Sequence, residues 1–592
     1  MSHIRIEGIQ VQNYRSFGQA VTVHFPNSDF KKPVAIVGYN NAGKTNFLNS
    51  ILYGITEKYV TKDTFTINDF HKRKFSNIPK IVTKVSSSSE PKVEWGTANL
   101  TGYHFLEIKL DGHEIESTKI SSYDDYNQSS RSSSAFGAAK YFKIFYINFH
   151  EIKKEISTKK TSWGNLSSFL AKHIRSIVDT DNIMVGKKDV FKGEVKSATD
   201  KVLADSKLNE FLGKIQINYS TNLRQNQCHI EFGLPDYEDI FLEMMFKVGL
   251  NGDMDNLVPI DHFGDGYISM FVMAVIQAIA ESNGTDKCLF LFEEPESFLH
   301  ENHQEYFYKT VLCGLAEKGH QVIYTTHSDK MLDIFDTRGL IRFEFDEITK
   351  QTVLKYNKHD KEIFEDSDEE ALSEIKDYYN YIKLIDPNLN KIIFSKKVLL
   401  VEGPNDLMTY KEIIRRNVLD ITADDKYAAT YLNFNNISII PHHGKITASI
   451  LIKLCKHFGI DYFVINDFDF EQDFVSELTF TSIDELQKSH LYNDGLEEII
   501  VFNSKGEAMN AKTKRSMITT NWRLISESSP AKIHFNIPKL ESVIGYDSND
   551  KSSVGIWNTL KKTSHFGEEI FPAKLQEFLE ITQIKKKHEG QN

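Results

Sequence analysis

Residues 38–45 read GYNNAGKT, which has the GxxxxGK[ST] spacing of a phosphate-binding loop. In such a loop successive backbone N–H groups face phosphate oxygens, while the lysine reaches the terminal phosphates and the hydroxyl meets Mg²⁺. Lys44 and Thr45 are in the positions for these two roles. The alternative is a glycine-rich turn without a ligand. The candidate nucleotide contacts are Gly38, Asn40, Asn41, Ala42, Gly43, Lys44, Thr45 and Asn46.

Acidic residues that suit the same chemistry follow an apolar run at residues 287–300, KCLFLFEEPESFLH. Glu293 is expected near the Mg²⁺ and its water shell, and Glu294 near the water that attacks the γ-phosphate. Residues 321–328, QVIYTTHS, predict a further strand that delivers His327 to the same sheet edge, where it would sense the γ-phosphate. A purely structural histidine is the alternative.

A Gly-Asp-Gly turn, Gly264, Asp265 and Gly266, precedes the apolar segment MFVMAVIQAIA. Such a turn at a helix start would present backbone N–H groups to the nucleotide of a second molecule, although it also suits an ordinary helix cap. One chain has one loop and one such segment. The sequence therefore predicts a homodimer or a larger even homo-oligomer.

A second set of carboxylates lies in the C-terminal half. Residues 397–403, KVLLVEG, predict a strand that ends at Glu402, with Asp406 one helical turn later. Residues 462–470, YFVINDFDF, predict another strand whose end presents Asp467 and Asp469 on one side. Crowded carboxylates repel one another unless cations join them, and oxygen ligands suit Mg²⁺ or Mn²⁺. A D-x-D pair alone is common, but the upstream V-E-G-x-x-D favours a metal site.

Two divalent cations held in this way can activate a water and stabilise the leaving oxygen of a phosphodiester. Hydrolysis then needs no covalent protein intermediate. A strand-passing enzyme would need a nucleophilic tyrosine on another domain, and no recognisable topoisomerase winged-helix segment is present. The sequence therefore favours a nuclease.

The chain resembles known families at these motifs. Residues 9–17, IQVQNYRSF, match the N-[FY]-R-[SN]-F turn that opens ABC-type ATPase heads of chromosome-maintenance and recombination proteins, which implies that Arg15 lies near the nucleotide. The acidic motifs resemble the TOPRIM fold of topoisomerases, primases and OLD nucleases. Nearly the whole chain is similar to the OLD (overcoming lysogenization defect) family, which includes the nuclease subunit of the Gabija antiviral system.

This resemblance implies two further site residues. Residues 537–545, IPKLESVIG, are similar to a D-L-E segment that supplies another metal ligand, here Glu541, although Pro538 and Lys539 replace the usual acidic neighbours. An exposed glutamate at a helix start is the alternative. Residues 559–562, TLKK, resemble the segment whose lysine stabilises phosphorane charge. Lys562 is the favoured residue, Lys561 is not distinguished from it, and a surface lysine is the alternative.

The motifs predict an α/β chain, namely an ABC-type P-loop ATPase with a helical insertion, followed by a TOPRIM domain. We assign residues 1–150 to the first ATPase lobe and 251–360 to the rest of the ATPase. Residues 151–250 are the insertion, which the resemblance implies is a dimerisation arm. Residues 361–394 are a connector, and residues 395–592 are the TOPRIM nuclease domain.

Composition is compatible with this organisation. The chain has 592 residues, enough for more than one core, and a formal net charge of −12. Phosphate contact depends on local basic patches, and two are candidates: residues 510–523, where Lys512, Lys514, Arg515 and Arg523 flank Trp522, and residues 584–588. Merely solvated charge is the alternative. Four scattered cysteines, no membrane-length apolar run and no signal-peptide core predict a reducing, cytoplasmic location.

These observations together predict an ATP-regulated, divalent-metal-dependent DNA endonuclease, and the resemblance implies a role in phage defence. Two alternatives stay open: a DNA-sensing or tethering ATPase whose TOPRIM domain binds metal without cutting, and a primase- or topoisomerase-like enzyme. The resemblance implies possible partners, a UvrD-like helicase or a retron reverse transcriptase with its DNA–RNA product. The sequence chooses neither the partner nor the cleavage site.

Overall fold

The structure is a computed structural model. It describes residues 4–55, 60, 64–87, 92–93, 96–97, 101–112, 114–123, 125–127, 144–152, 179, 182–204, 210–211, 213–217, 247–249, 255–282, 287–363, 378, 380–386, 388–497, 499–501, 507–546 and 552–584. The chain divides into two compact units, Met1–Ala35 with Gly43–Thr326 and Ile36–Ala42 with His327–Asn592. The phosphate-binding loop is continuous and so contributes residues to both units.

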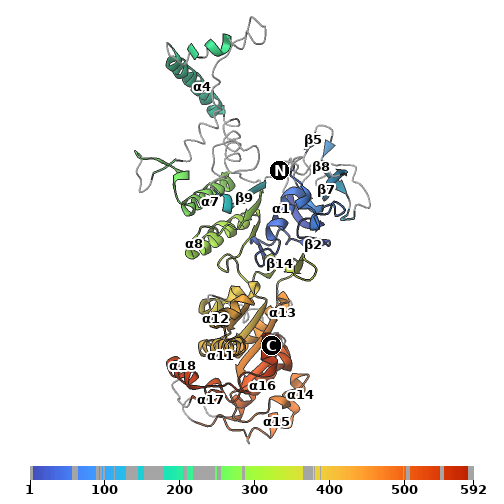
Figure 1. Cartoon of the computed structure of the whole chain (residues 1–592), viewed down its shortest axis with the longest axis vertical. Helices are drawn as coiled ribbons and strands as arrows, with labels where there is room; N and C mark the ends of the chain where they lie inside the picture. The colour runs from blue at the N-terminus through green and yellow to red at the C-terminus, as the bar shows by residue number, and fades with distance from the viewer. Residues whose placement is uncertain are drawn as a thin grey trace. The chain divides into compact units, whose positions relative to one another are not determined.

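An antiparallel sheet in the first unit has the strand order β2-β1-β4-β7-β8 (Figure 1). Apolar residues at every second position, such as Ile9 and Val11, are fully buried, which is the pattern of a sheet with one face on the core. Its strands are β1 (Ile4–Gln12), β2 (Val21–His24), β4 (Lys80–Ser87), β7 (Gly102–Asp111) and β8 (Glu114–Tyr123).

Parallel strands carry the acidic motif of the same unit. Strand β12 (Leu289–Glu293) pairs in parallel with β9 (Ile144–Asn148) on one side and β13 (Gln321–Thr325) on the other. All five residues of β12 are buried, as expected for a central strand with both faces covered. Helices of this unit include α1 (Lys44–Ile55), α7 (Asp265–Ser282), α8 (Glu301–Tyr306) and α9 (Cys313–Glu317), with a π-helical turn at Phe307–Leu312 before α9.

The predicted insertion at residues 151–250 contains the helix α4 (Asn182–Leu203) (Figure 1). The short strand β10 (Lys247–Val248) closes it and pairs antiparallel with β11 (Val258–Pro259). The segment 167–178, which the sequence predicts as helical, lies outside the described residues. The dimerisation role of this insertion stays a prediction.

The second unit begins with a hairpin and ends with a parallel sheet. Strands β14 (Leu340–Asp346) and β15 (Gln351–Tyr356) pair antiparallel. The parallel sheet has the order β17-β16-β18-β19, formed by β16 (Lys397–Val401), β17 (Ile437–Pro441), β18 (Asp461–Asp467) and β19 (Ile533–Asn536). Parallel strands bring their carboxyl ends to one edge, so this sheet gathers the residues that follow each strand.

Helices cover the parallel sheet and build its core (Figure 1). The longer ones are α11 (Pro404–Thr422), α12 (Asp425–Phe434), α13 (Lys445–Phe458), α16 (Ala511–Ser528) and α18 (Ser553–Lys562). The shorter ones are α14 (Ile483–Lys488), α15 (His490–Asn493), α17 (Leu540–Val543) and α19 (Ala573–Phe578). Leu399, Tyr410, Phe463 and Leu575 lie in one buried cluster that joins strands to helices.

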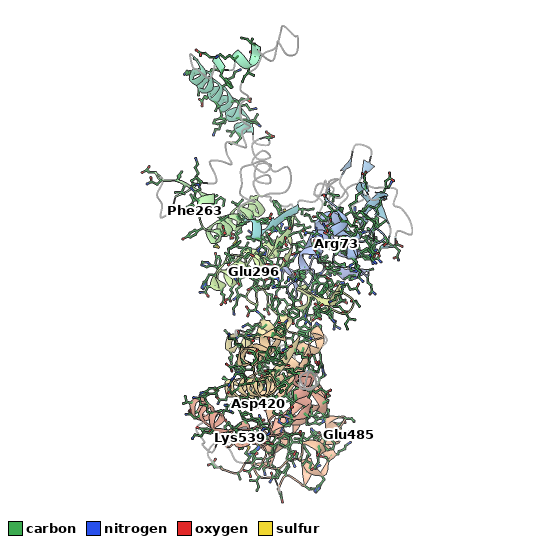
Figure 2. The ribbon with its side chains drawn as sticks, viewed as in Figure 1. Arg73, Phe263, Glu296, Asp420, Glu485 and Lys539 are labelled. Atoms are coloured by element: carbon green, nitrogen blue, oxygen red, sulfur yellow. The ribbon has the colours of Figure 1, made fainter. Side chains whose placement is uncertain are left out.

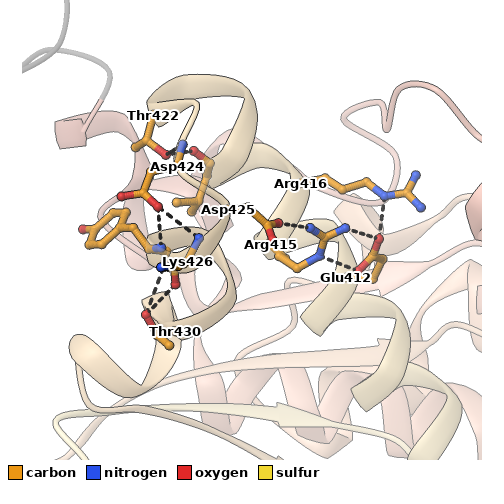
Figure 3. A network of polar contacts seen from close by, with 10 residues as sticks. Glu412, Arg415, Arg416, Thr422, Asp424, Asp425, Lys426 and Thr430 are labelled. Carbon is orange, nitrogen blue, oxygen red and sulfur yellow. Dashed lines mark hydrogen bonds and ion pairs between the residues drawn. The ribbon is translucent and has the colours of Figure 1, made fainter.

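A polar network fixes the corner between α11 and α12 (Figure 3). Arg415 pairs with Glu412 of its own helix and with Asp425 in the first turn of α12, at 2.9 Å in each case. Asp424 caps α12 by accepting hydrogen bonds from the backbone N–H groups of Lys426 and Tyr427. These contacts orient the helix that begins beside Glu402.

The three described cysteines, Cys288, Cys313 and Cys455, are free thiols. No helix within the described parts of the chain is both long and apolar enough to cross a membrane.

Candidate metal-binding and nucleotide-binding sites

Glu402 and Asp467 meet where two adjacent parallel strands end. Glu402 follows β16, Asp467 is the last residue of β18, and these strands pair from Lys397 with Asp461 onward. The Glu402 Oε2 accepts hydrogen bonds from the Asp467 N–H at 3.1 Å and the Asn466 Nδ2 at 3.3 Å. The structure therefore brings together the two acids that the sequence places at strand ends.

Asp406 and Glu541 extend the same cluster from two helix starts. Asp406 lies in the first turn of α11, and its Oδ2 accepts a hydrogen bond from the Gly403 N–H at 3.2 Å. Glu541 lies in α17, and the preceding Leu540 donates its N–H to the Asp467 Oδ1 at 2.9 Å. Asp406, Asp467 and Glu541 are at most 7% exposed. Glu541 is thus buried among the acids rather than on the surface, despite its non-acidic neighbours Pro538 and Lys539 (Figure 2 labels Lys539).

The electrostatics of the cluster follow from the burial and proximity of its members. Burial raises the pKa of Asp406 from 3.8 to about 7, with further contributions from Glu402 and Glu541. Burial also raises the pKa of Asp467 well above its usual value, with contributions from Glu402, Asp406 and Asp469. Both shifts have the sign expected when carboxylates are desolvated beside like charges.

Two buried oxygens in the cluster, Asp406 Oδ1 and Glu541 Oε2, have no hydrogen-bond partner among the described residues. Buried carboxylate oxygens without donors are costly unless a cation meets them. The donor set is all oxygen, which suits a hard divalent cation. Within the described ranges, no three His, Cys, Asp or Glu side chains are already arranged around one ion position, so side chains must move to bind one. The residues fit a divalent metal in chemical type and burial.

The metal-free protein should lose stability as pH rises from about 4 to about 7. In this window Asp406 keeps its proton in the folded state and loses it in the unfolded state, because its folded pKa is the higher one. Three pH units at about 1.4 kcal/mol each bound the effect at roughly 4 kcal/mol. Thermal melting in EDTA across this window measures it, and Asp406→Asn should flatten the profile. An unchanged profile in that variant would contradict the assignment.

Asp469 lies on the side of the cluster that faces solvent. It follows β18 in the left-handed region, at φ 68°, and its side chain is 41% exposed. Its Oδ2 forms an ion pair with the Lys445 Nζ at 2.5 Å. Lys445 was not among the site residues predicted from the sequence. It could have been found, because residues 437–445 read ISIIPHHGK, an apolar strand followed by a glycine turn that ends at the same sheet edge.

The late lysines are not among the residues that the structure brings to the carboxylates. Lys561 and Lys562 are both exposed in the last turn of α18, and the Lys561 Nζ lies over the Trp557 ring at 5.3 Å. The carbonyl of the next residue, Thr563, accepts a hydrogen bond from Arg416 at 2.9 Å. Arg416 lies ten residues after Asp406 on α11, about 15 Å further along that helix.

The predicted basic surface on α16 serves partly as internal support. Lys514 is buried and donates to the carbonyls of Leu496, at 2.9 Å, and Ile499. Arg515 donates to the Tyr492 carbonyl at 3.1 Å, and Trp522 to the Phe480 carbonyl at 2.8 Å. These side chains hold the segment after β18 against α16. Of the basic residues in the predicted patch, Lys512 and Arg523 are exposed. Residues 585–588 of the second predicted patch lie outside the described residues.

The phosphate-binding loop has the backbone that its glycines predict. Gly38 has φ 153°, and a Cβ there would lie 2.4 Å from the Phe343 carbonyl oxygen, which excludes other residues. Asn41, at φ 65°, and Gly43, at φ 94°, are also in the left-handed region. Asn40 and Asn41 are exposed, and Ala42 is buried. This sequence of turns is the kind that presents backbone N–H groups to an anion.

Lys44 lies in a buried site beside acids. Burial lowers its pKa to about 8, while Glu294 and Glu296 act in the opposite direction. Half-buried Thr45 follows it in α1. Glu296, labelled in Figure 2, accepts a hydrogen bond from the Thr326 hydroxyl at 2.8 Å. A desolvated ammonium group is stabilised by an anionic ligand, as a phosphate-binding role requires.

The paired acids have partners that the sequence did not indicate. The Tyr146 hydroxyl donates to the Glu293 Oε2 at 2.6 Å. The Glu294 Oε2 contacts the His150 Nε2 at 2.7 Å, and Glu294 has φ 45°. Tyr146 lies on β9, which pairs with β12, and His150 follows shortly after β9. Glu293 and Glu294, at the end of one strand, are therefore held by different partners.

Arg15 lies beside the first turn of α1, as the resemblance implies. Its Nη1 donates to the Asn46 Oδ1 at 3.2 Å, and its Nε pairs with the Asp69 Oδ1 at 2.8 Å. Arg15 itself has φ 48°, and its backbone N–H donates to the Asp69 carbonyl at 2.8 Å. Asp69 thus holds Arg15 at both its backbone and its side chain.

The Gly-Asp-Gly turn forms the start of α7. Gly264 is exposed just before the helix, Asp265 is its first residue, and a Cβ on Gly266 would lie 3.1 Å from the Phe298 carbonyl oxygen. The structure thus leaves this helix start open at Gly264. His327 is exposed two residues after β13.

Comparisons with known proteins find similar domains in the two parts of the chain. A family model described as "Overcoming lysogenization defect protein-like, TOPRIM domain" matches residues 393–469. Models described as "AAA ATPase domain" and "AAA domain" match residues 157–332 and 9–243. The chain is 23% identical over 485 residues to the OLD nuclease of Thermus scotoductus. The aligned region covers 78% of this chain and 82% of that protein. The chain is thus similar to an OLD nuclease over most of its length.

A second relative is the protein named Endonuclease GajA of Bacillus cereus strain VD045. The two are 24% identical over 438 residues, which covers 69% of this chain and 68% of that protein. Among solved structures, that of the SmcHead bound to the C-winged helix domain of ScpA is similar to 59% of this chain and 96% of its own, with 14% identity and a TM-score of 0.33. This likeness is too weak to support an argument.

The matched domains confirm the predicted α/β order of an ATPase followed by a TOPRIM domain. These two domain types imply the use of a nucleotide and of a divalent metal ion.

Proposed function

We propose that this chain is an ATP-regulated DNA endonuclease that uses Mg²⁺ or Mn²⁺ and acts in antiviral defence. One observation carries the chemistry: acids from separate segments meet at one sheet edge, where two of their buried oxygens have no partner among the described residues. The names of the relatives, OLD nuclease and Endonuclease GajA, support the nuclease class, and the resemblance to the family that includes the Gabija nuclease subunit supports the defence role.

In the proposed reaction each acid has a defined task. Asp467, Asp469 and Glu402 would ligate the cations, and Asp406 and Glu541 would add the two oxygens that lack partners. The bound cations would supply an activated water and stabilise the leaving 3′ oxygen. Asn466 and Leu540 already hold Glu402 and Asp467 by hydrogen bonds, which limits the movement needed on binding. Lys562 stays a candidate for stabilising phosphorane charge.

At the other site, Lys44 would bind the terminal phosphates and Thr45 and Glu293 the Mg²⁺ of ATP, with Glu294 orienting the attacking water. Exposed Gly264 and the start of α7 would face the nucleotide of a second copy, so we propose a homodimer or larger even oligomer. His327 would sense the γ-phosphate. Protein partners such as a helicase or a reverse transcriptase remain open proposals.

A continuous path within the second unit supports regulation by ATP. The Thr352 hydroxyl of β15 donates to the Ala42 carbonyl of the phosphate-binding loop at 3.1 Å. At the far end of β15, the Tyr356 hydroxyl contacts the His457 Nε2 at 2.7 Å. His457 lies in the last turn of α13, whose first residue is Lys445 beside Asp469. Movement of the loop could therefore reach the acids through one strand and one helix.

The Tyr356 contact has a defined direction. The Tyr356 hydroxyl donates to the Thr337 carbonyl at 3.0 Å, so it accepts from the His457 Nε2. Burial, the larger cause, and the nearby Lys358 lower the pKa of His457 to about 4, so the ring is neutral at pH 7 and carries its proton on Nε2.

Tyr356→Phe should weaken the effect of ATP on cleavage, because it removes the hydroxyl that joins β15 to α13. The ratio of cleavage rates with and without ATP should move toward one, with a loss of about 1 kcal/mol in stability. Tyr431→Phe is the matched control, since it removes another buried tyrosine-to-carbonyl bond, to Leu579, away from this path. Equal loss of rate with and without ATP in Tyr356→Phe would contradict the path.

The function itself is tested by incubating purified protein with supercoiled plasmid while metal and ATP are varied independently. Metal-dependent nicking or linearisation supports the nuclease. Metal binding with intact plasmid would instead support a DNA-tethering ATPase, and a covalent protein–DNA species on denaturing gels would support a topoisomerase-like enzyme.

A further inference from the structure

Lys445 is a lysine built into the acidic cluster. Its Nζ lies 2.5 Å from the Asp469 Oδ2 and donates to the Asn521 Oδ1 at 2.8 Å. Its side chain is only 13% exposed, which is unusual for a lysine. Among the described residues, Lys445 is the basic side chain that forms an ion pair with one of these carboxylates, Asp469.

The turn before Lys445 is tied to the backbone of the cluster. The His442 N–H donates to the Val401 carbonyl at 2.8 Å, and the His443 N–H to the Glu402 carbonyl at 3.0 Å. Gly444 then has φ 136°, a conformation that favours glycine. Lys445 therefore begins α13 in a position set by the end of β16 and by Glu402.

Asn521 provides the second acceptor for the Lys445 ammonium group. It is fully buried, and its Nδ2 donates to the Phe468 carbonyl at 2.8 Å. This bond orients the amide so that its Oδ1 faces Lys445. Lys445 thus has two fixed acceptors, one neutral and one a proposed metal ligand.

We propose that Lys445 is an internal counter-cation that competes with the divalent metal for Asp469 and so sets the affinity of the site. The inference rests on the proposed metal-dependent function. Without metal, Lys445 offsets part of the repulsion among the acids. A cation that binds Asp469 must first displace this ammonium group, because two cations cannot share one carboxylate oxygen without mutual repulsion.

A lysine that only supports the fold would behave in the opposite way. Its removal would release Asp469 and weaken metal binding. A competing lysine leaves a more negative site when it is removed, and metal then binds more tightly. The sign of the change in metal affinity therefore separates the two roles.

The test is calorimetric titration of Mn²⁺ into the full chain without DNA or nucleotide. Lys445→Met keeps the apolar stem and should tighten Mn²⁺ binding by about threefold to tenfold, whereas Lys445→Arg should stay near wild type. In an Asp469→Asn background, Lys445→Met should have little further effect. Weaker or unchanged binding in the single Lys445→Met variant would overturn the proposal.

Lys453→Met is the matched control. Lys453 lies on the same helix and pairs with Glu527 at 3.3 Å rather than with the cluster, so Mn²⁺ affinity should not change. Failure of the proposed function looks different. If wild type binds Mn²⁺ and Lys445→Met tightens it while plasmid stays intact, the nuclease proposal fails and Lys445 keeps its role. Absence of Mn²⁺ binding to wild type would overturn both.

Discussion

Asp467→Ala is expected to lower metal-dependent plasmid cleavage by at least about a hundredfold. Asp467 connects the segments that carry Glu402 and Glu541. Its backbone N–H binds Glu402, and its Oδ1 accepts from Leu540, which precedes Glu541. Truncation removes a ligand and also loosens the segment that carries a second one. Initial rates of supercoil loss at saturating Mg²⁺ or Mn²⁺ measure the change.

The control for this variant lies at the other end of the same strand. Asp461 begins β18 and pairs on the surface with Lys532 at 2.7 Å, so Asp461→Ala should keep cleavage within about twofold of wild type. Cleavage that survives in Asp467→Ala would place the nuclease site elsewhere in the protein. Nucleotide binding should be the same in both variants.

Lys44→Ala is expected to weaken ATP binding by about a hundredfold or more. The ammonium group is buried beside Glu294 and Glu296, and a charge-assisted contact to phosphate is worth roughly 3 kcal/mol. Equilibrium binding of a fluorescent ATP analogue, with competition by ATP, measures the loss.

Two measurements support the interpretation of that variant. Lys84→Ala removes a half-exposed lysine that pairs with Glu7 in the same unit and should leave ATP affinity unchanged. Mn²⁺ titration should show that the carboxylate site of Lys44→Ala is intact. Wild-type ATP affinity in Lys44→Ala would refute the assignment of the phosphate-binding loop.

Local patterns were enough to predict where most of the acids lie. Glu402 and Asp467 follow apolar runs, and parallel strands carry such residues to one edge. The role of Glu541 as a further metal ligand was implied by resemblance alone, because no periodicity links a four-residue helix to strands more than 70 residues earlier. The α/β class followed from the phosphate-binding loop and the acidic motifs at strand ends.

Side-chain partners depended on the tertiary fold and were harder to predict. Lys445 follows an apolar strand and a glycine turn, which indicate its sheet edge, but its pairing with Asp469 depends on the hydrogen bonds of that turn to Val401 and Glu402. Lys514 resembles a surface charge in the sequence, but the fold buries it and pairs it with the carbonyls of Leu496 and Ile499. A run of charges cannot show which of its members will find carbonyl partners.

The scattered origin of the cluster has a consequence for synthesis on the ribosome. Glu541 is 139 positions after Glu402, and the core beneath them includes Leu575 and Ile581. A nascent chain that has emerged only as far as Asp469 lacks one carboxylate and the side chains that close the domain. The proposed metal site would therefore be complete only after the C-terminal helices have docked.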